Sequence, residues 1–224
     1  MDFSRFLAFP LEQIPYVVVA LAVAFSVHEF SHAYVAWKFG DPTAKNQGRL
    51  TLSPLAHLDI LGTLFIFIAG FGWAKPVPVN RFFFKNPRLA GFLVSAAGPV
   101  SNLFVAALGM AVYYGLAGTG VLDNLSAQMN EVLYQFFNIL IYLNVVLFVF
   151  NLLPFPPLDG YRMIEDLAPK DIRARMTQYE AYGIFLFLFL VITPLDQYTI
   201  QPIFRTFIPM VLDTMDVIFS PFIR

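Results

Sequence analysis

The sequence contains no cysteine and few charged residues, and both absences exclude whole classes of protein. Its 224 residues offer no thiol for a disulfide, a zinc finger, an iron–sulfur cluster or a cysteine nucleophile. Charged residues make up 13% of the chain, against about 25% in an average soluble domain. The formal net charge is −1, so we expect no nucleic-acid partner. A metal site in this chain must be built from His, Asp and Glu.

The sequence contains several long hydrophobic runs. Apolar residues make up 58% of the chain, and a bilayer span needs about 20 of them in succession. Three runs reach that length, at 14–39, 89–116 and 132–153, and a fourth at 181–195 needs flanking residues. The segment 199–219 contains three charged residues and is a candidate for an interfacial helix. We predict an all-α polytopic membrane protein with about four to six transmembrane helices, forming a single domain over residues 1–224.

The positions of Lys and Arg predict the orientation of these runs. The loop 117–131 has neither residue, whereas 73–90 and 162–175 each carry four, so the last two are predicted to be cytoplasmic. The loop 38–56 is also basic, which places cytoplasmic loops on both sides of 57–72. We therefore predict that 57–72 is a re-entrant segment. Residues 49–52 and the Pro/Val alternation at 75–80 predict a small cytoplasmic β element with an open edge.

Two of the three histidines stand four residues apart, in the sequence HEFSH at 28–32. On a helix, His28 and His32 share a face and can bind one metal ion. Glu29 can then act as a general base on a metal-activated water. A polar helix end at the interface is the alternative, but burying three such residues in an apolar helix is costly without a function.

A catalytic zinc site usually has three protein ligands, and the third must come from elsewhere. His57 and Asp159 are the candidates. Asp159 is preferred because it follows the third run after three prolines, which break the helix near the predicted cytoplasmic side. His57 is more readily explained as a structural or second-shell residue.

Three asparagines in the apolar runs are further candidates for a substrate or oxyanion site. Asn102 either faces the cavity or helps a close helix contact beside Gly98 and Pro99. Asn144 lies seven residues before Asn151, so the two can share a helix face, although hydrogen bonding between helices also explains them.

The motifs together resemble the site-2 protease family of intramembrane zinc metalloproteases (peptidase family M50). The resemblance is carried by HEFSH, by AAGPVSN at 96–102 and by NLLPFPPLDG at 151–160, and the stretch 40–63 is similar to the short prokaryotic subgroup without PDZ or CBS domains. It implies a three-helix core with one zinc per chain bound by His28, His32 and Asp159. It also implies that Glu29 is the catalytic acid/base and that Asn151 contacts the substrate backbone or oxyanion.

The function predicted from these observations is hydrolysis of a peptide bond within or near a transmembrane segment, as in regulated intramembrane proteolysis. The expected partners are the lipid bilayer and a membrane-protein substrate; a regulatory membrane partner and the oligomeric state stay open. The resemblance implies a prokaryotic inner or plasma membrane, with the active site toward the cytoplasm. A transporter or channel is one alternative, but the sequence has no inverted repeat. An inactive scaffold is the other, and the intact Glu29 argues against it.

Overall fold

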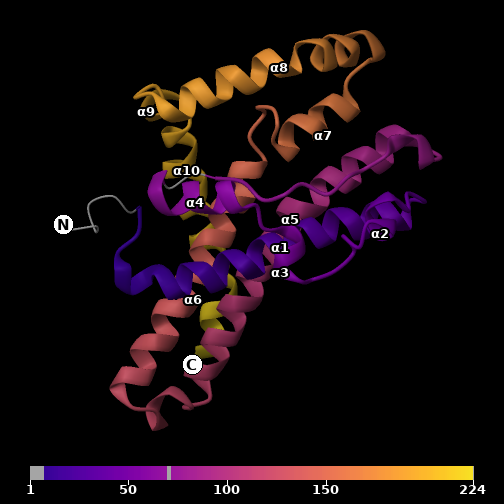
Figure 1. Ribbon diagram of the computed structural model, residues 1–224. Helices are drawn as coiled ribbons and strands as arrows, with labels where there is room; N and C mark the ends of the chain where they lie inside the picture. The colour runs from indigo at the N-terminus through magenta and orange to yellow at the C-terminus, as the bar shows by residue number, and fades with distance from the viewer. Residues whose placement is uncertain (1–7, 70–71, 224) are drawn as a thin grey trace.

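The computed structural model describes residues 8–69 and 72–223, and almost all of its regular structure is helical (Figure 1). No β-strand occurs among the described residues. The main helices are α1 (Ile14–Lys38), α4 (Ile60–Ala69), α5 (Pro87–Gly118), α6 (Ala127–Asn151), α7 (Asp159–Leu167), α8 (Lys170–Ile192) and α10 (Gln201–Phe219), with the single turns α2 (Thr43–Asn46), α3 (Pro54–His57) and α9 (Asp196–Thr199). The predicted all-α class is confirmed.

Local sequence signals set the ends of the long helices. Pro87 opens α5, and the side chain of Asn86 caps it by accepting a hydrogen bond from the Leu89 amide at 3.3 Å. The side chain of Ser126 caps α6 in the same way, by accepting from Met129 at 3.2 Å. At the other end of α6, three prolines follow Asn151 within six residues and prevent the helix from continuing.

The helices α1, α5 and α6 pack against one another and form the centre of the molecule. Within the described residues, three helical segments are long and apolar enough to cross a membrane, namely Leu11–Lys38, Pro87–Gly118 and Ala127–Asn151. Their contact buries Val17, Leu21 and Phe25 of α1 against Leu140 and Leu143 of α6. The number of spans beyond these three stays a prediction.

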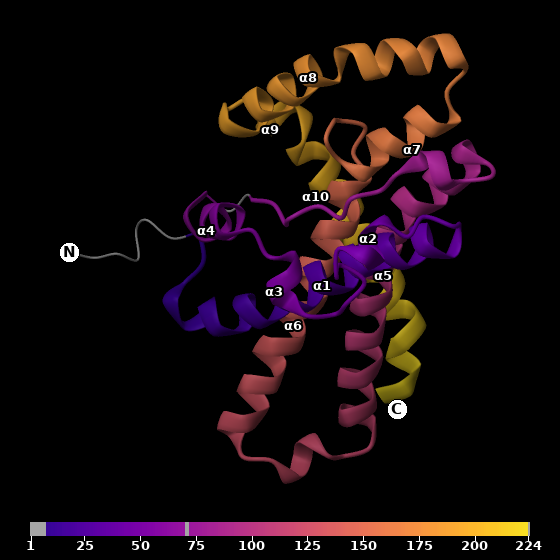
Figure 2. The same cartoon turned by 45° about the vertical axis from the view of Figure 1, so that its right-hand side comes forward.

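The C-terminal helices cover this centre on two sides. The helix α10 lies beside the α5–α6 hairpin in both views, and its Ile208 and Met215 are buried against Ala106 and Val145 (Figures 1 and 2). The helices α7, α8 and α9 form a layer on the opposite side from the tip of that hairpin. The predicted interfacial helix at 199–219 is thus a helix packed along two of the long ones.

The small β element predicted at 49–52 and 75–80 does not form among the described residues, where one isolated antiparallel bridge joins Leu58 and Ala74, outside both segments. Pro76 and Pro78 have no amide hydrogen, so a ladder cannot extend through them. The predicted re-entrant segment contains α4, whose ten residues are about half of what a span needs. Its entry into the membrane stays a prediction.

Candidate active site

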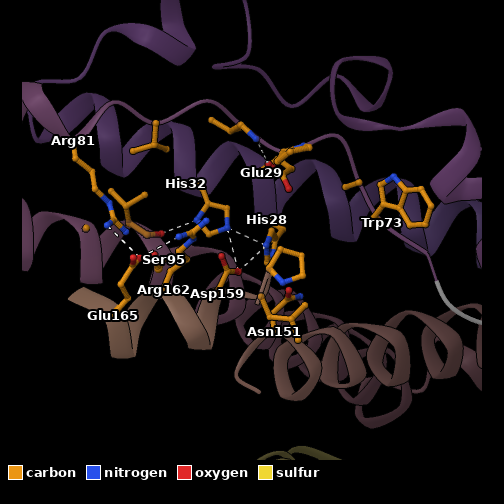
Figure 3. Close-up of a pocket in the computed structure, with 18 of the residues that line it drawn as sticks. His28, Glu29, His32, Trp73, Arg81, Ser95, Asn151, Asp159, Arg162 and Glu165 are labelled. Carbon is orange, nitrogen blue, oxygen red and sulfur yellow. Dashed lines mark hydrogen bonds and ion pairs between the residues drawn. The ribbon is translucent and has the colours of Figure 1, made fainter. Parts of the chain in front are cut away.

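Two histidine side chains on α1 meet the first carboxylate of α7 at the centre of the molecule (Figure 3). The Nε2 atoms of His28 and His32 lie 3.0 Å apart. They lie 3.2 and 3.3 Å, respectively, from Oδ2 of Asp159. All three side chains are buried or half-buried. The structure therefore brings together the three residues that the sequence motifs singled out as metal ligands.

The other nitrogen of each imidazole is held by an oxygen atom from α5. Nδ1 of His32 lies 2.6 Å from the carbonyl oxygen of Val94, which can only accept a hydrogen bond. Nδ1 of His28 lies 2.6 Å from Oδ1 of Asn102. Both Nδ1 atoms are therefore donors, and in the neutral imidazoles both Nε2 atoms carry a lone pair toward Asp159.

The donor set fits a divalent cation. Two Nε2 lone pairs and a carboxylate oxygen converge, with all ligand atoms within 4.8 Å of one another. Oδ2 of Asp159 is buried and has no hydrogen-bond donor among the described residues. Three acceptors that face one another repel unless a cation lies between them, and His and carboxylate ligands with one further open position are typical of catalytic zinc.

Gly98 of α5 makes room for this centre. A Cβ atom at that position would lie within 3.0 Å of Nε2 of both His28 and His32. The backbone of α5 therefore passes directly beneath the metal-ligating edges of the imidazoles, and only glycine allows that approach.

Asp159 reaches the centre through the turn that follows α6. Prolines at 154, 156 and 157 end the helix, and Asp159 begins α7. Burial by itself raises the pKa of the Asp159 carboxyl. In the metal-free chain, protonated His32 and His28 lower it by more, so that its pKa lies well below the usual range. A bound cation would take over this effect when both imidazoles are neutral ligands. The carboxyl is therefore an anion, as a metal ligand must be.

A cavity of about 850 Å³ opens beside the three ligands. Glu29 and Asn151 line it together with the ligands, and residues 73–79 form part of its wall. Oε2 of Glu29 accepts a hydrogen bond from the main-chain amide of Val77 at 2.8 Å. A carboxylate beside a group of candidate metal ligands, in a shared cavity, is an arrangement suited to general acid–base hydrolysis.

The end of the cavity near α7 is lined by an ion-pair network (Figure 3). Arg162 lies 3.1 Å from Glu165, and Arg81 lies 2.9 Å from Asp166. Thr177 of α8 donates a hydrogen bond to Glu165 at 2.7 Å. Burial raises the pKa of the Glu165 carboxyl, but Thr177 and Arg162 lower it by more, and the net shift is downward. This network fixes α7, and with it Asp159, against α8 and the loop before α5.

The remaining predicted site residues fall in different places. Asn151 lines the cavity, and its amide donates to the Leu147 carbonyl at 2.9 Å. Asn102 is fully buried behind His28 and donates to Oδ1 of Asn144 at 3.0 Å. Neither Asn102 nor Asn144 is among the described residues that line the cavity. Asn102 contacts His28 and the Ala24 carbonyl of α1, and Asn144 holds Asn102 from α6, so both lie behind a candidate metal ligand.

His57 does not join the metal group. It is fully buried, and its Nε2 lies 2.7 Å from the Thr51 carbonyl oxygen. Its own carbonyl accepts a hydrogen bond from the amide of Lys75 at 2.8 Å. The His57 side chain therefore contacts the loop 51–57, and its main chain joins that loop to the segment that borders the cavity; the structural or second-shell role expected from the sequence stays a prediction.

Sequence reasoning missed the groups that act through the main chain. The Val94 carbonyl and the Val77 amide leave no side-chain signal, and the need for Gly98 appears only when α1 lies across α5. The alternation of proline and valine at 75–80 was a visible signal, but it indicated a strand rather than a donor for Glu29.

Comparison with known proteins agrees with this geometry. The model of peptidase family M50 matches residues 16–193. The chain belongs to peptidase family M50. It is 55% identical over 218 residues to "Putative zinc metalloprotease YwhC" of Bacillus subtilis, covering 97% of this chain and 99% of that protein. It is 33% identical over 184 residues to "Putative zinc metalloprotease Rip2" of Mycobacterium tuberculosis, covering 80% and 67% of the two chains. No solved structure gives a significant match.

Membership in family M50 supports a protease of the site-2 type, and three long apolar helices support an integral membrane protein. The matched region contains the whole His28–His32–Asp159 group and the cavity wall formed by residues 73–79.

Proposed function

We propose that this protein is a zinc-dependent intramembrane endopeptidase that hydrolyses a peptide bond within or near a transmembrane segment of another membrane protein. The observation that carries the proposal is the convergence of two oriented Nε2 atoms and the Asp159 carboxyl group beside Glu29. His28, His32 and Asp159 would hold the zinc, one ion per chain. The names of the similar proteins agree with this metal.

Bound zinc would supply a Lewis acid that activates water and polarises the scissile carbonyl. Glu29 would take the proton from the water and give it to the leaving amine. Asn151, which lines the cavity, is the candidate donor to the substrate carbonyl, although its amide first has to leave the Leu147 carbonyl. Asn102 and the Val94 carbonyl would keep both imidazoles in the tautomer that presents Nε2.

The substrate would bind in an unwound state, because the carbonyls of a helix are engaged in its own hydrogen bonds. The cavity wall includes Ala74, Pro76, Val77 and Val79, and we propose that an extended substrate lies against this segment. Because the prolines lack an amide hydrogen and the Val77 amide is engaged by Glu29, the segment would bind the substrate chiefly through its carbonyl groups. We also propose that this edge faces the cytoplasmic side of a prokaryotic inner or plasma membrane, because the adjoining loops are rich in Lys and Arg. On this view the activity serves regulated intramembrane proteolysis.

Zinc content is the first test. The wild-type chain and two variants, Asp159→Ala and His57→Ala, are purified in mild detergent, and zinc per chain is measured by elemental analysis. We expect about one zinc per chain in the wild type and in His57→Ala, and loss of zinc in Asp159→Ala. A wild-type chain without metal under chelator-free conditions would contradict the proposal, and loss in His57→Ala alone would show that the wrong third ligand was chosen.

Glu29→Gln separates metal binding from catalysis. The substitution keeps the shape of the side chain but removes the base, so zinc should stay while cleavage of a fluorogenic peptide with one apolar span is abolished. Cleavage by that variant at the wild-type rate would exclude Glu29 as the acid/base.

A further inference from the structure

Residues 75–80 form a narrow strip of main chain along the cavity, and this strip contains an unusual arrangement of hydrogen-bond donors. Pro76 and Pro78 have no amide hydrogen, and each restricts the residue before it to an extended conformation. Val77, between them, therefore supplies the one amide hydrogen of the Pro–Val–Pro sequence. That hydrogen is directed at Oε2 of Glu29, at 2.8 Å.

The strip is fastened at both ends by buried groups. At its start, the Lys75 amide donates to the His57 carbonyl at 2.8 Å, and Arg49 donates to the Lys75 carbonyl at 2.6 Å. At its end, the Asn80 amide donates to Oδ2 of Asp41 at 2.6 Å, and Asp41 is fully buried. Because both ends are held, the position of the Val77 amide is fixed relative to α1.

We propose that the main-chain amide of Val77 is the positioning group of Glu29. This inference rests on the proposed function, in which Glu29 is the acid/base. The Glu29 side chain rotates about three bonds, and a single donor at a fixed place removes much of that freedom before the substrate arrives. Oε2 is held by the amide, which leaves Oε1 to exchange the proton with water and the leaving amine.

The same inference assigns one role, holding the strip in place, to three buried residues that do not line the cavity. His57, Arg49 and Asp41 each hold one end of the strip, and none of them belongs to the metal group. They act on Glu29 through the strip. The two prolines add to the effect, because they stiffen the main chain on either side of the donor and remove competing amide hydrogens.

Amide hydrogen exchange tests the contact without any need for activity. The full chain is labelled with ¹⁵N-valine and ¹⁵N-asparagine in micelles, and exchange at Val77 and Asn80 is compared between the wild type and Glu29→Ala. We expect exchange at Val77 to become about 10- to 100-fold faster, because the variant lacks the carboxylate that accepts the Val77 hydrogen bond. Exchange at Asn80 should stay unchanged. Unchanged exchange at Val77 would overturn the proposal. Equally faster exchange at Val77 and Asn80 would also overturn the proposal, because Glu29 would then hold the strip in place rather than be positioned by it.

A matched pair of substitutions tests the consequence for catalysis. Val77→Pro removes the amide hydrogen in an already extended segment, and Val77→Ala keeps it while removing the same side chain. With a fluorogenic single-span peptide, we expect Val77→Pro to lose about 10- to 100-fold in kcat with KM and zinc content little changed, and Val77→Ala to behave like the wild type. Equal losses in both variants would overturn the proposal. If the wild type binds no zinc and cleaves nothing while the exchange result holds, then the proposed function fails and the Val77–Glu29 contact stands.

Discussion

Replacing Gly98 with alanine tests the proposed metal centre without mutating any of the three ligand residues. The added Cβ would lie within 3.0 Å of Nε2 of His28 and of His32. Zinc binds imidazole nitrogen at about 2.0–2.1 Å, so the methyl group would enter the space that the ion and its ligands share. Ligand distances in a well-formed zinc site lie within about 0.2 Å of their standard values, and relieving this overlap would move the imidazoles by more than that.

Loss of a hydrogen bond that supports a metal ligand typically lowers metal affinity by about 10- to 100-fold, which is about 1.4–2.7 kcal/mol. We expect Gly98→Ala to lower zinc affinity by a larger factor than this. The assay is a competition titration against a chromophoric chelator, with the purified chain in detergent. Gly115→Ala is the matched control, because it lies on the same helix and a Cβ there has no neighbour within 4 Å. The control should bind zinc normally and gain up to about 1 kcal/mol of helix stability.

A thermal melt distinguishes loss of metal from loss of fold. Because the added methyl group overlaps the imidazoles even without zinc, zinc-free Gly98→Ala should melt somewhat below the zinc-free wild type but still in one cooperative transition, and the titration is run below both transitions. If Gly98→Ala binds zinc as tightly as the wild type, then the Nε2 atoms do not face α5 as described, and the assignment of the ligand atoms is wrong.

Three further predictions follow from the packing around the site. Asn102→Ala should lower zinc affinity by about 10- to 100-fold, because His28 loses the acceptor of its Nδ1 hydrogen bond. The control, Asn124→Ala at an exposed position, should leave zinc affinity unchanged in the same titration. Saturation with zinc at about 1,000 times its Kd should add about 4 kcal/mol to the free energy of unfolding, and a chelator should remove this gain in a thermal melt. Glu165→Gln should cost about 1–3 kcal/mol at pH 7 in a denaturant titration, less than a fully buried pair because Arg162 is 33% exposed. Since the pKa of Glu165 is lowered on folding, its stabilising effect is complete above the ordinary glutamate pKa of about 4.3, and the difference from Glu165→Gln should shrink as the pH falls below that value.

The group of candidate metal ligands could be predicted from the sequence because two of its three members are local. His28 and His32 lie one helical turn apart, and the periodicity of a helix alone brings them to one face. Asp159 could be chosen because three prolines end an apolar run just before it, and a carboxylate at a broken helix end near the membrane needs a partner. Each inference needed only the residues within a few turns of the site.

The supporting contacts could not be predicted, because they depend on how distant helices cross. The partner of His28 on α5 lies 74 residues away in the sequence, and the partner of His32 is a main-chain carbonyl. The strand expected at 75–80 did not form for a different reason. The alternating pattern correctly indicated extended chain, but Pro76 and Pro78 leave too few amide donors for a β ladder. Only packing showed that the Val77 amide faces Glu29.

The distribution of the ligands along the chain has a consequence for how the protein is made. His28 and His32 belong to the first long helix, whereas Asp159 follows the last of the three, with α5 and α6 between them. A nascent chain that has inserted only α1 and α5 would carry two of the three ligands and lack the turn that delivers the third. Tight metal binding therefore has to wait until α6 is in place and α7 has docked, and the free energy of binding then helps to close the fold. On the proposed function, activation is in this way tied to the completion of synthesis, and an unfinished chain would not yet hold a working hydrolytic centre.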